Sequence, residues 1–173
     1  HSSGIIAMTG CLAGRFANRL VKDRPDEARA HVDELMNAFG AENVYFEVQK
    51  NGIADQDKAN EGIVRIAREL GRPLVAAGDV HYLRREDYHH HTALLCVQTK
   101  STLAAPKMTF ETNEFFLRSS EEMAQAFAEW PDAIPSTKDE SPLAAAMRTA
   151  FASKPSFVDA PALPAEYVII IRM

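Results

Sequence analysis

Short apolar runs alternate with amphipathic segments along the first half of the chain, and this order restricts the fold more than any other feature. The runs "GIIAMTG" (4–10), "NVYFEVQ" (43–49) and "PLVAAGDVHYL" (73–83) are typical of β-strands. The third run begins without polar alternation, which indicates a strand buried on both faces, as in a parallel sheet. Strands that alternate with helices predict an α/β fold built from βαβ units.

Two helices are predicted between these strands. The first has Pro25 and two acidic residues in its first turn and Gly40 at its carboxyl end, as helix boundaries commonly do. The second runs from about Gln56 to Leu70. Each carries apolar residues at helical spacing, so each can lay one face on a sheet.

The second half of the chain is less regular. Residues 85–99 are predicted to be helical, and the pair Ser119 and Glu122 has the spacing of a capping box at the start of another helix. From about residue 137 the sequence is rich in Ala, Pro and Ser and has no sustained period. We therefore predict a poorly specified tail over 137–173, with one short helix at about 143–152.

The composition limits the classes of function. The 173 residues carry a net charge of −5, so a surface that coats nucleic acid by electrostatics alone is not indicated. The two cysteines do not make a disulfide framework, and no apolar run approaches the roughly 20 residues of a membrane-spanning helix. We therefore expect a cytoplasmic protein with reduced thiols and no membrane partner.

Two of the predicted strands end in residue types that bind metals. Cys11 follows the first strand, and Asp79 and His81 end the third, where functional groups collect in parallel α/β folds. In an extended backbone, residues i and i+2 face the same side, so Asp79 and His81 can converge on one cation such as Zn²⁺, Mn²⁺ or Fe²⁺. The alternatives stay open: Asp79 caps a turn, His81 is a packed polar residue, and Cys11 is a small buried apolar residue.

The histidine triplet His89–His91 is predicted to be a solvated helix face. Successive helical residues are rotated by about 100°, so three adjacent side chains cannot aim at one ion. His31, in the middle of the first helix, is also predicted to be exposed. Glu47 either enters a polar barrel interior or is a structural hydrogen-bond acceptor. The sequence contains no phosphate-binding glycine loop, no G-x-S-x-G and no C-x-x-C, so nucleophilic Ser or Cys catalysis has no support.

Four stretches together resemble the bacterial DNA polymerase III alpha subunit: "GIIAMTGCLAG", "VYFEVQKNGIADQDKANEGIVRIARELGRPLVAAGDVHYLRRED", "HTALLCVQTKSTL" and "FETNEFFLRSSEEMAQAFAEWPDAI". They stand in the family's order within 3–136 and resemble its PHP (polymerase and histidinol phosphatase) domain and the junction after it. The resemblance implies a distorted β/α barrel with a metal cluster at the carboxyl ends of its strands. It also implies that Cys11, Asp79 and His81 are ligands of that cluster and that His89–His91 are not.

The resemblance also implies what this chain lacks. In the family, an H-x-H motif and further ligands lie upstream of the matched segment, so we expect the C-terminal part of a PHP domain, an open half-barrel with a minority of the ligands. The expected divisions are the PHP part at 1–100, a junction toward the polymerase core at 101–136, and the tail at 137–173. Nothing in the tail resembles the polymerase palm, and a truncated or frame-shifted gene would explain both ends.

The expected function is that of a fragment of a replicative DNA-directed DNA polymerase, a nucleotidyltransferase. Its PHP module is a metal-dependent 3′–5′ exonuclease in some family members. The expected partners are DNA, through the parent polymerase, and other replisome subunits. One alternative is a non-catalytic PHP module that stabilises the polymerase or docks a proofreading subunit. The other is a stand-alone PHP phosphatase, against which the stretch "FETNEFFLRSSEEMAQAF" speaks. The fragment alone is expected to be inactive, because most ligands are missing.

Overall fold

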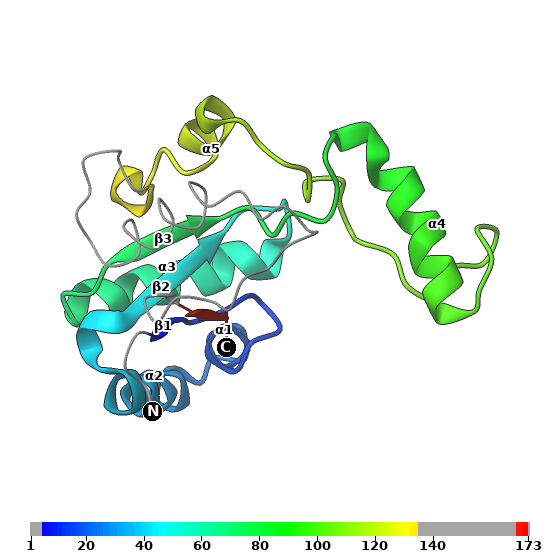
Figure 1. The fold of residues 1–173 in the computed structure, drawn as a ribbon. Coiled ribbons are helices and arrows are strands. Elements are labelled where there is room, and N and C mark those ends of the chain that lie inside the picture. The colour runs from blue at the N-terminus through cyan, green and yellow to red at the C-terminus, as the bar shows by residue number, and fades with distance from the viewer. Residues whose placement is uncertain (1–4, 135–168, 173) are drawn as a thin grey trace, which may run out of the picture.

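The computed structural model describes residues 5–134 and 169–172, and its strands form one parallel sheet (Figure 1). The order across the sheet is β3-β2-β1-β4, and each neighbouring pair is parallel. The parallel arrangement confirms the predicted α/β fold and is consistent with part of a PHP-type barrel. The strands are β1 (Ile5–Met8), β2 (Val44–Gln49), β3 (Leu74–Ala77) and β4 (Ile169–Arg172).

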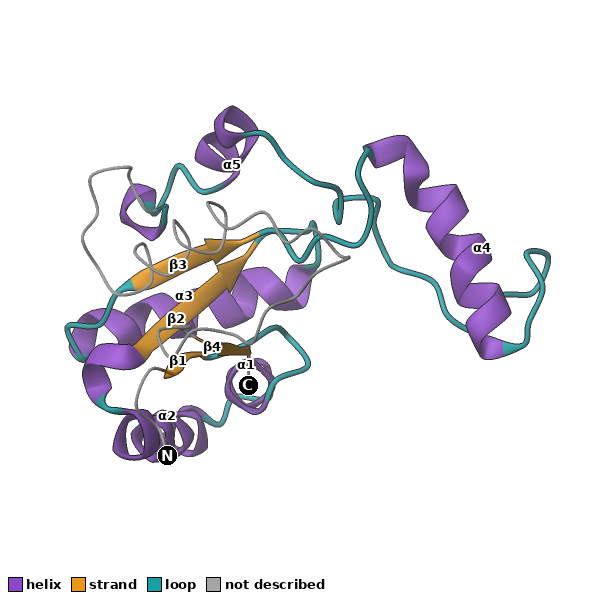
Figure 2. Cartoon of the chain, in the orientation of Figure 1, coloured by secondary structure: helices purple, strands orange, loops and turns teal. Residues whose placement is uncertain are grey.

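The helices alternate with the first three strands and then continue beyond them (Figure 2). The predicted helices are confirmed: α2 begins at Pro25, Gly40 ends it with a φ of 85°, and α3 covers the second predicted helix. Short 3₁₀ turns lie at Ala41–Asn43, Arg85–Asp87 and Pro131–Ala133. The helices are α1 (Arg15–Val21), α2 (Pro25–Phe39), α3 (Ala54–Glu69), α4 (Tyr88–Thr99) and α5 (Ser120–Ala126).

The main core lies between one face of the sheet and the helices α1, α2 and α3. Val44, Phe46 and Val48 of β2 point into this core and are fully buried, as the two-residue alternation of a strand requires. The ring of Phe46 meets that of Phe16 edge to face, with centroids 5.6 Å apart. Tyr45 packs on the opposite face of the sheet with Ile6 and Val75. Both faces of β2 are therefore buried, as its position in the middle of a parallel sheet requires.

Helix α1 was not predicted, and it changes the environment of α2. It packs against both α2 and α3, and Gly62 of α3 permits the close approach, since a Cβ there would lie 2.8 Å from Cδ2 of Leu20. Arg15 of α1 pairs with Glu34 of α2 at 2.8 Å, and Nδ1 of the neighbouring His31 lies 3.4 Å from the same carboxylate. His31 is buried, so the prediction that it is exposed was wrong. The reason is that a second helix covers this side of α2.

Strand β4 lies in the segment for which the sequence predicted only a poorly specified tail. It pairs with the outer edge of β1, with Ile5 opposite Ile169 and Met8 opposite Arg172. A run of four residues is too short for its periodicity to distinguish strand from helix, so its pairing partner decides its conformation. The short helix predicted at 143–152 lies outside the described residues.

Two features of the second half follow the sequence patterns. The capping box is confirmed, since the Ser119 side chain accepts from the Glu122 amide at 3.2 Å and the Ser119 amide donates to Glu122 at 2.8 Å. Beyond α5, Phe127 and Trp130 join the main core.

Helix α4 confirms the helix predicted at 85–99 and stands apart from the sheet in Figure 2. Within the described residues, every helix is too short or too polar to cross a membrane.

Candidate functional site at the carboxyl edge of the sheet

The predicted ligands follow the carboxyl ends of parallel strands. Cys11 follows β1, Asp79 and His81 follow β3, and β2 lies between these two strands. Because parallel strands end at the same edge of a sheet, this edge collects the loops that carry all three residues. The expected placement after strand ends therefore holds, and the details of each loop decide what the side chains can do.

A buried polar network occupies this edge between the end of β2 and helix α3. Nε2 of Gln49 donates to Oε1 of Glu47 at 2.6 Å, and Nε2 of Gln56 donates to Oε1 of Gln49 at 3.0 Å. Asn60 donates from its side chain to the Gln49 carbonyl at 2.8 Å. All four residues are at most 4% exposed, so their polar groups depend on one another rather than on solvent. Glu47 thus accepts a hydrogen bond inside the fold.

The α3 half of this network was not predicted from the sequence. Gln56 and Asn60 are four residues apart and share one helix face, beside the apolar residues Ala59 and Ile63. Two amide side chains on an otherwise apolar helix face, near a strand that carries Glu47, could have indicated a buried polar network. A search for apolar residues at helical spacing does not detect these two polar residues on the same face.

Cys11 lies beside this network. The half-buried thiol shares with Glu47, Gln49 and Gln56 the lining of a small cavity of about 10 Å³. That volume is close to the lower limit for one water molecule. The surroundings of Cys11 are therefore polar on one side, which differs from the environment of a purely apolar core cysteine.

Asn51 ties the end of β2 to two distant segments. Its buried side chain donates to the Gly78 carbonyl at 2.9 Å and to the Glu114 carbonyl at 3.0 Å. Its amide N–H donates to Gln56 at 2.8 Å, and its side-chain oxygen accepts from the Gln56 Nε2 at 3.1 Å. Gly78 directly precedes Asp79. Asn51 therefore positions the loop that carries the Asp79 and His81 pair.

The backbone at Asp79 differs from the prediction. Strand β3 ends at Ala77, and Asp79 has a φ of 48°, in the left-handed region. The assumption of an extended backbone from Asp79 to His81 was therefore wrong, and the i, i+2 rule for strands does not orient this pair. Instead, Nδ1 of His81 lies 2.7 Å from the backbone oxygen of Asp79. A carbonyl can only accept, so the proton is on Nδ1, and in the neutral ring the Nε2 lone pair remains available to a ligand.

Aromatic rings surround the imidazole of His81. Its centroid lies 4.7 Å from that of Phe110, 5.6 Å from that of Phe115 and 5.6 Å from that of His91. Burial and the nearby His81 lower the pKa of His91. His89 and His90 are exposed, as predicted, whereas His91 is half-buried. The prediction of a solvated face was therefore wrong for His91, because the helix turns this residue toward the rings of the preceding loop.

The donors present do not complete a metal site. Across residues 5–134 and 169–172, the side chains of His, Cys, Asp and Glu form no group of three or more that could hold a metal ion. Cys11, Asp79 and His81 follow strands that end at one edge, but they are not grouped as a ligand set. We therefore assign no reaction step to a metal held by this chain alone.

Comparisons with known proteins show which proteins this chain resembles. Residues 1–51, which contain β1, β2 and Cys11, match the PHP domain. The DNA polymerase III subunit alpha of Treponema pallidum is 38% identical over 138 residues, which are 79% of this chain and 12% of that protein. The chain is thus similar to part of the DNA polymerase III alpha subunit. The predicted resemblance is thereby confirmed.

Other relatives agree with this assignment. The DNA polymerase III subunit alpha of Thermus aquaticus is 37% identical over 135 residues, or 76% of this chain and 11% of that protein. That of Deinococcus radiodurans is 38% identical over 133 residues, or 75% of this chain and 10% of that protein. The chain thus spans only 10–12% of the length of these relatives.

Proposed function

We propose that this chain is part of the PHP module of a replicative DNA polymerase, a DNA-directed nucleotidyltransferase. The observation that carries the proposal is the 38% identity to a polymerase III alpha subunit over 79% of the chain. The match to the PHP domain and the parallel sheet support it. DNA and other replisome subunits are the proposed partners, and the cytoplasm is the proposed location. The names of the relatives disfavour the stand-alone phosphatase.

We further propose that Cys11, Asp79 and His81 become metal ligands when the rest of the module is present. A thiolate, a carboxylate and an imidazole suit Zn²⁺, Mn²⁺ or Fe²⁺. The contact between Nδ1 of His81 and the Asp79 carbonyl supports this role, because it leaves Nε2 available. The proposed 3′–5′ exonuclease activity belongs to the complete module. This chain alone is expected to bind metal weakly and to show no nuclease activity, since its described donors form no complete site.

A non-catalytic module that docks another subunit is the second candidate. Two observations favour it: the described donors are not grouped, and α4 exposes Leu94 and Val97, which are 63% and 77% exposed. Exposed apolar side chains that recur on one helix are typical of protein–protein contacts. This candidate predicts that the complete subunit binds no stoichiometric metal at this edge.

Metal analysis of the complete alpha subunit, paired with an exonuclease assay on a mismatched primer, tests the two candidates. We expect bound metal and 3′–5′ activity, with both lost in Asp79→Asn and in His81→Gln. The matched control is His90→Gln, which removes an exposed imidazole on α4 and should change neither. Metal content and activity that survive both substitutions would refute the ligand assignment. A metal-free, inactive wild-type subunit would favour the docking role.

A further inference from the structure

A second polar site lies beside Asn51 and contains none of the predicted metal ligands. A cavity of about 590 Å³ opens between the residues after β2, the turn at Arg85–Asp87 and α5. The volume is within the range of small-molecule sites in proteins. The charged and aromatic residues in its wall are Lys50, Arg85, Glu114, Phe116, Arg118 and Glu122.

Arg118 is the most constrained cation of this wall. Its side chain is only 6% exposed, and its Nη2 donates to the Lys50 carbonyl at 2.9 Å and to Oε2 of Glu114 at 3.1 Å. Its Nη1 is buried and has no hydrogen-bond partner within the described part of the chain. A buried cationic donor without an acceptor is costly, so such groups commonly mark a position that an acceptor fills.

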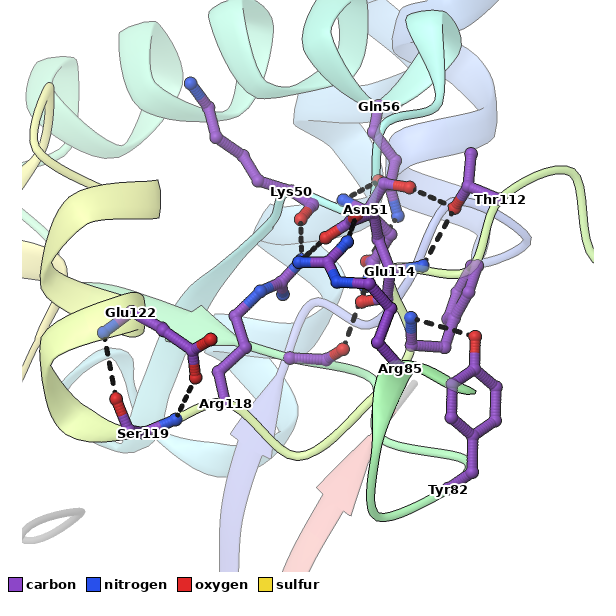
Figure 3. Close-up of polar contacts among 12 residues, drawn as sticks. Lys50, Asn51, Gln56, Tyr82, Arg85, Thr112, Glu114, Arg118, Ser119 and Glu122 are labelled. Atoms are coloured by element: carbon purple, nitrogen blue, oxygen red, sulfur yellow. Dashed lines mark hydrogen bonds and ion pairs between the residues drawn. The ribbon is translucent and has the colours of Figure 1, made fainter. Parts of the chain in front are cut away.

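Two guanidinium groups share one carboxylate here. Oε1 of Glu114 pairs with Arg85, while Oε2 pairs with Arg118. Both guanidinium groups lie over the ring of Phe116, 4.4 Å and 5.2 Å from its centroid. Figure 3 shows the two groups side by side around Glu114, although they come from segments that are far apart in the sequence. Burial and the charge of Arg85 lower the pKa of Arg118, as expected for a cation that is incompletely compensated.

The other charges of the wall are engaged elsewhere. Glu122 accepts from the Ser119 amide in the capping box. The Lys50 ammonium pairs with Glu129 and lies 5.1 Å from the centroid of the Trp130 ring. In Figure 3 this ammonium points away from the two guanidinium groups. Glu114 is therefore the carboxylate that pairs directly with both guanidinium groups, while the charge of Glu122 also acts on Arg118, and Nη1 of Arg118 remains an unused donor among the described residues.

We propose that this cavity binds a phosphate group through Arg85 and Arg118. The planar donors of two guanidinium groups match the oxygens of a phosphate, which would accept from Nη1 of Arg118. Since Nη1 is covered from solvent in this structure, binding requires a side-chain shift in the wall. The Arg85 side chain is about half exposed, so its guanidinium is already accessible to a ligand. The inference that a DNA strand supplies the phosphate rests on the proposed polymerase function. The inference of a phosphate site does not.

Titration of the 173-residue chain with inorganic phosphate, at ionic strength matched with chloride, tests the site. We expect saturable binding that Arg85→Gln weakens at least about tenfold, because a hydrogen bond to a charged group is worth about 1.5–3 kcal/mol. The control Arg68→Gln removes an exposed arginine of α3 that is not part of this wall and should bind like wild type. Glu114→Gln should tighten binding, because it removes the carboxylate that competes with the phosphate.

Different outcomes test the phosphate site and the source of the phosphate. Absence of saturable phosphate binding, or equal weakening by Arg85→Gln and Arg68→Gln, would overturn the site. Circular dichroism of each variant checks that it folds. A single-stranded oligonucleotide that binds more tightly than inorganic phosphate, and loses this advantage in Arg85→Gln, would support DNA as the source. Equal affinity for both would retain the phosphate site and refute that source. The metal and exonuclease tests of Asp79 and His81 address different residues, so they can fail independently.

Discussion

Replacement of Asn51 by alanine should loosen the loop that carries Asp79 and His81. The side chain of Asn51 is fully buried and makes three hydrogen bonds, to the Gly78 carbonyl, the Glu114 carbonyl and Nε2 of Gln56. Asn51→Ala leaves these three groups without that partner. An unsatisfied buried group costs about 1–3 kcal/mol, and partial access of water to the two carbonyls reduces the sum. We therefore expect the free energy of unfolding to fall by about 2–4 kcal/mol.

Urea denaturation followed by circular dichroism measures this loss. Asn51→Asp provides a test of sign, because a carboxylate facing two carbonyl oxygens repels them and should be at least as destabilising as alanine. The matched control is Asn113→Ala, which removes an exposed amide nearby and should change stability by less than about 0.5 kcal/mol.

Hydrogen exchange locates the effect. Amide protection should fall first in the segments that Asn51 joins, after β3 and before α5. A loss of stability below about 1 kcal/mol in Asn51→Ala would refute the predicted role of these hydrogen bonds, because unsatisfied buried groups destabilise the fold by more than that. Unchanged exchange in both segments would refute the positioning role even if the protein were destabilised.

Three further predictions concern the core, a pH dependence and a helix cap. Phe46→Ala should cost about 3–5 kcal/mol in urea denaturation, because Phe46 is fully buried, whereas Leu117→Ala, at an exposed position, should cost little. Contacts with His31 and Arg15 lower the pKa of Glu34 below its ordinary value of 4.5, so the stabilisation is present above that value and is lost as pH falls through the lower folded pKa. Stability measured against pH should therefore decline less steeply below 4.5 in Glu34→Gln, and an unchanged slope would contradict the assignment. Ser119→Ala should destabilise α5 by about 1 kcal/mol, measured by amide exchange, because it removes the N-cap acceptor.

The elements of the first half are predictable from local patterns. Apolar runs, helical spacing and the boundary residues Pro25 and Gly40 are sufficient for β1, α2, β2, α3 and β3, because each acts on its own neighbours in the sequence. The same holds for the Ser119 and Glu122 capping box. The ordered motifs also predicted the resemblance to the DNA polymerase III alpha subunit, which the relatives confirm.

The candidate sites are predictable only in part. Placing Cys11, Asp79 and His81 after parallel strands requires only the strand order, and the structure bears out that placement. The orientation of Asp79 was not predictable, since its left-handed φ of 48° lies in a loop held by Asn51, a residue from another strand end. The burial of His31 likewise depends on α1, which reaches α2 only in the folded chain.

Contacts between distant segments are decided by the tertiary structure. Arg85 and Arg118 meet at Glu114 because the chain returns beside the end of β2 after α4, and β4 adds to β1 from the far end of the sequence. The helices and strands of the first half depend largely on adjacent residues, so the sequence pattern already contains them. The partners of a buried amide, a guanidinium or a strand edge depend on which segments the topology brings together. Short-range sequence patterns do not predict these contacts.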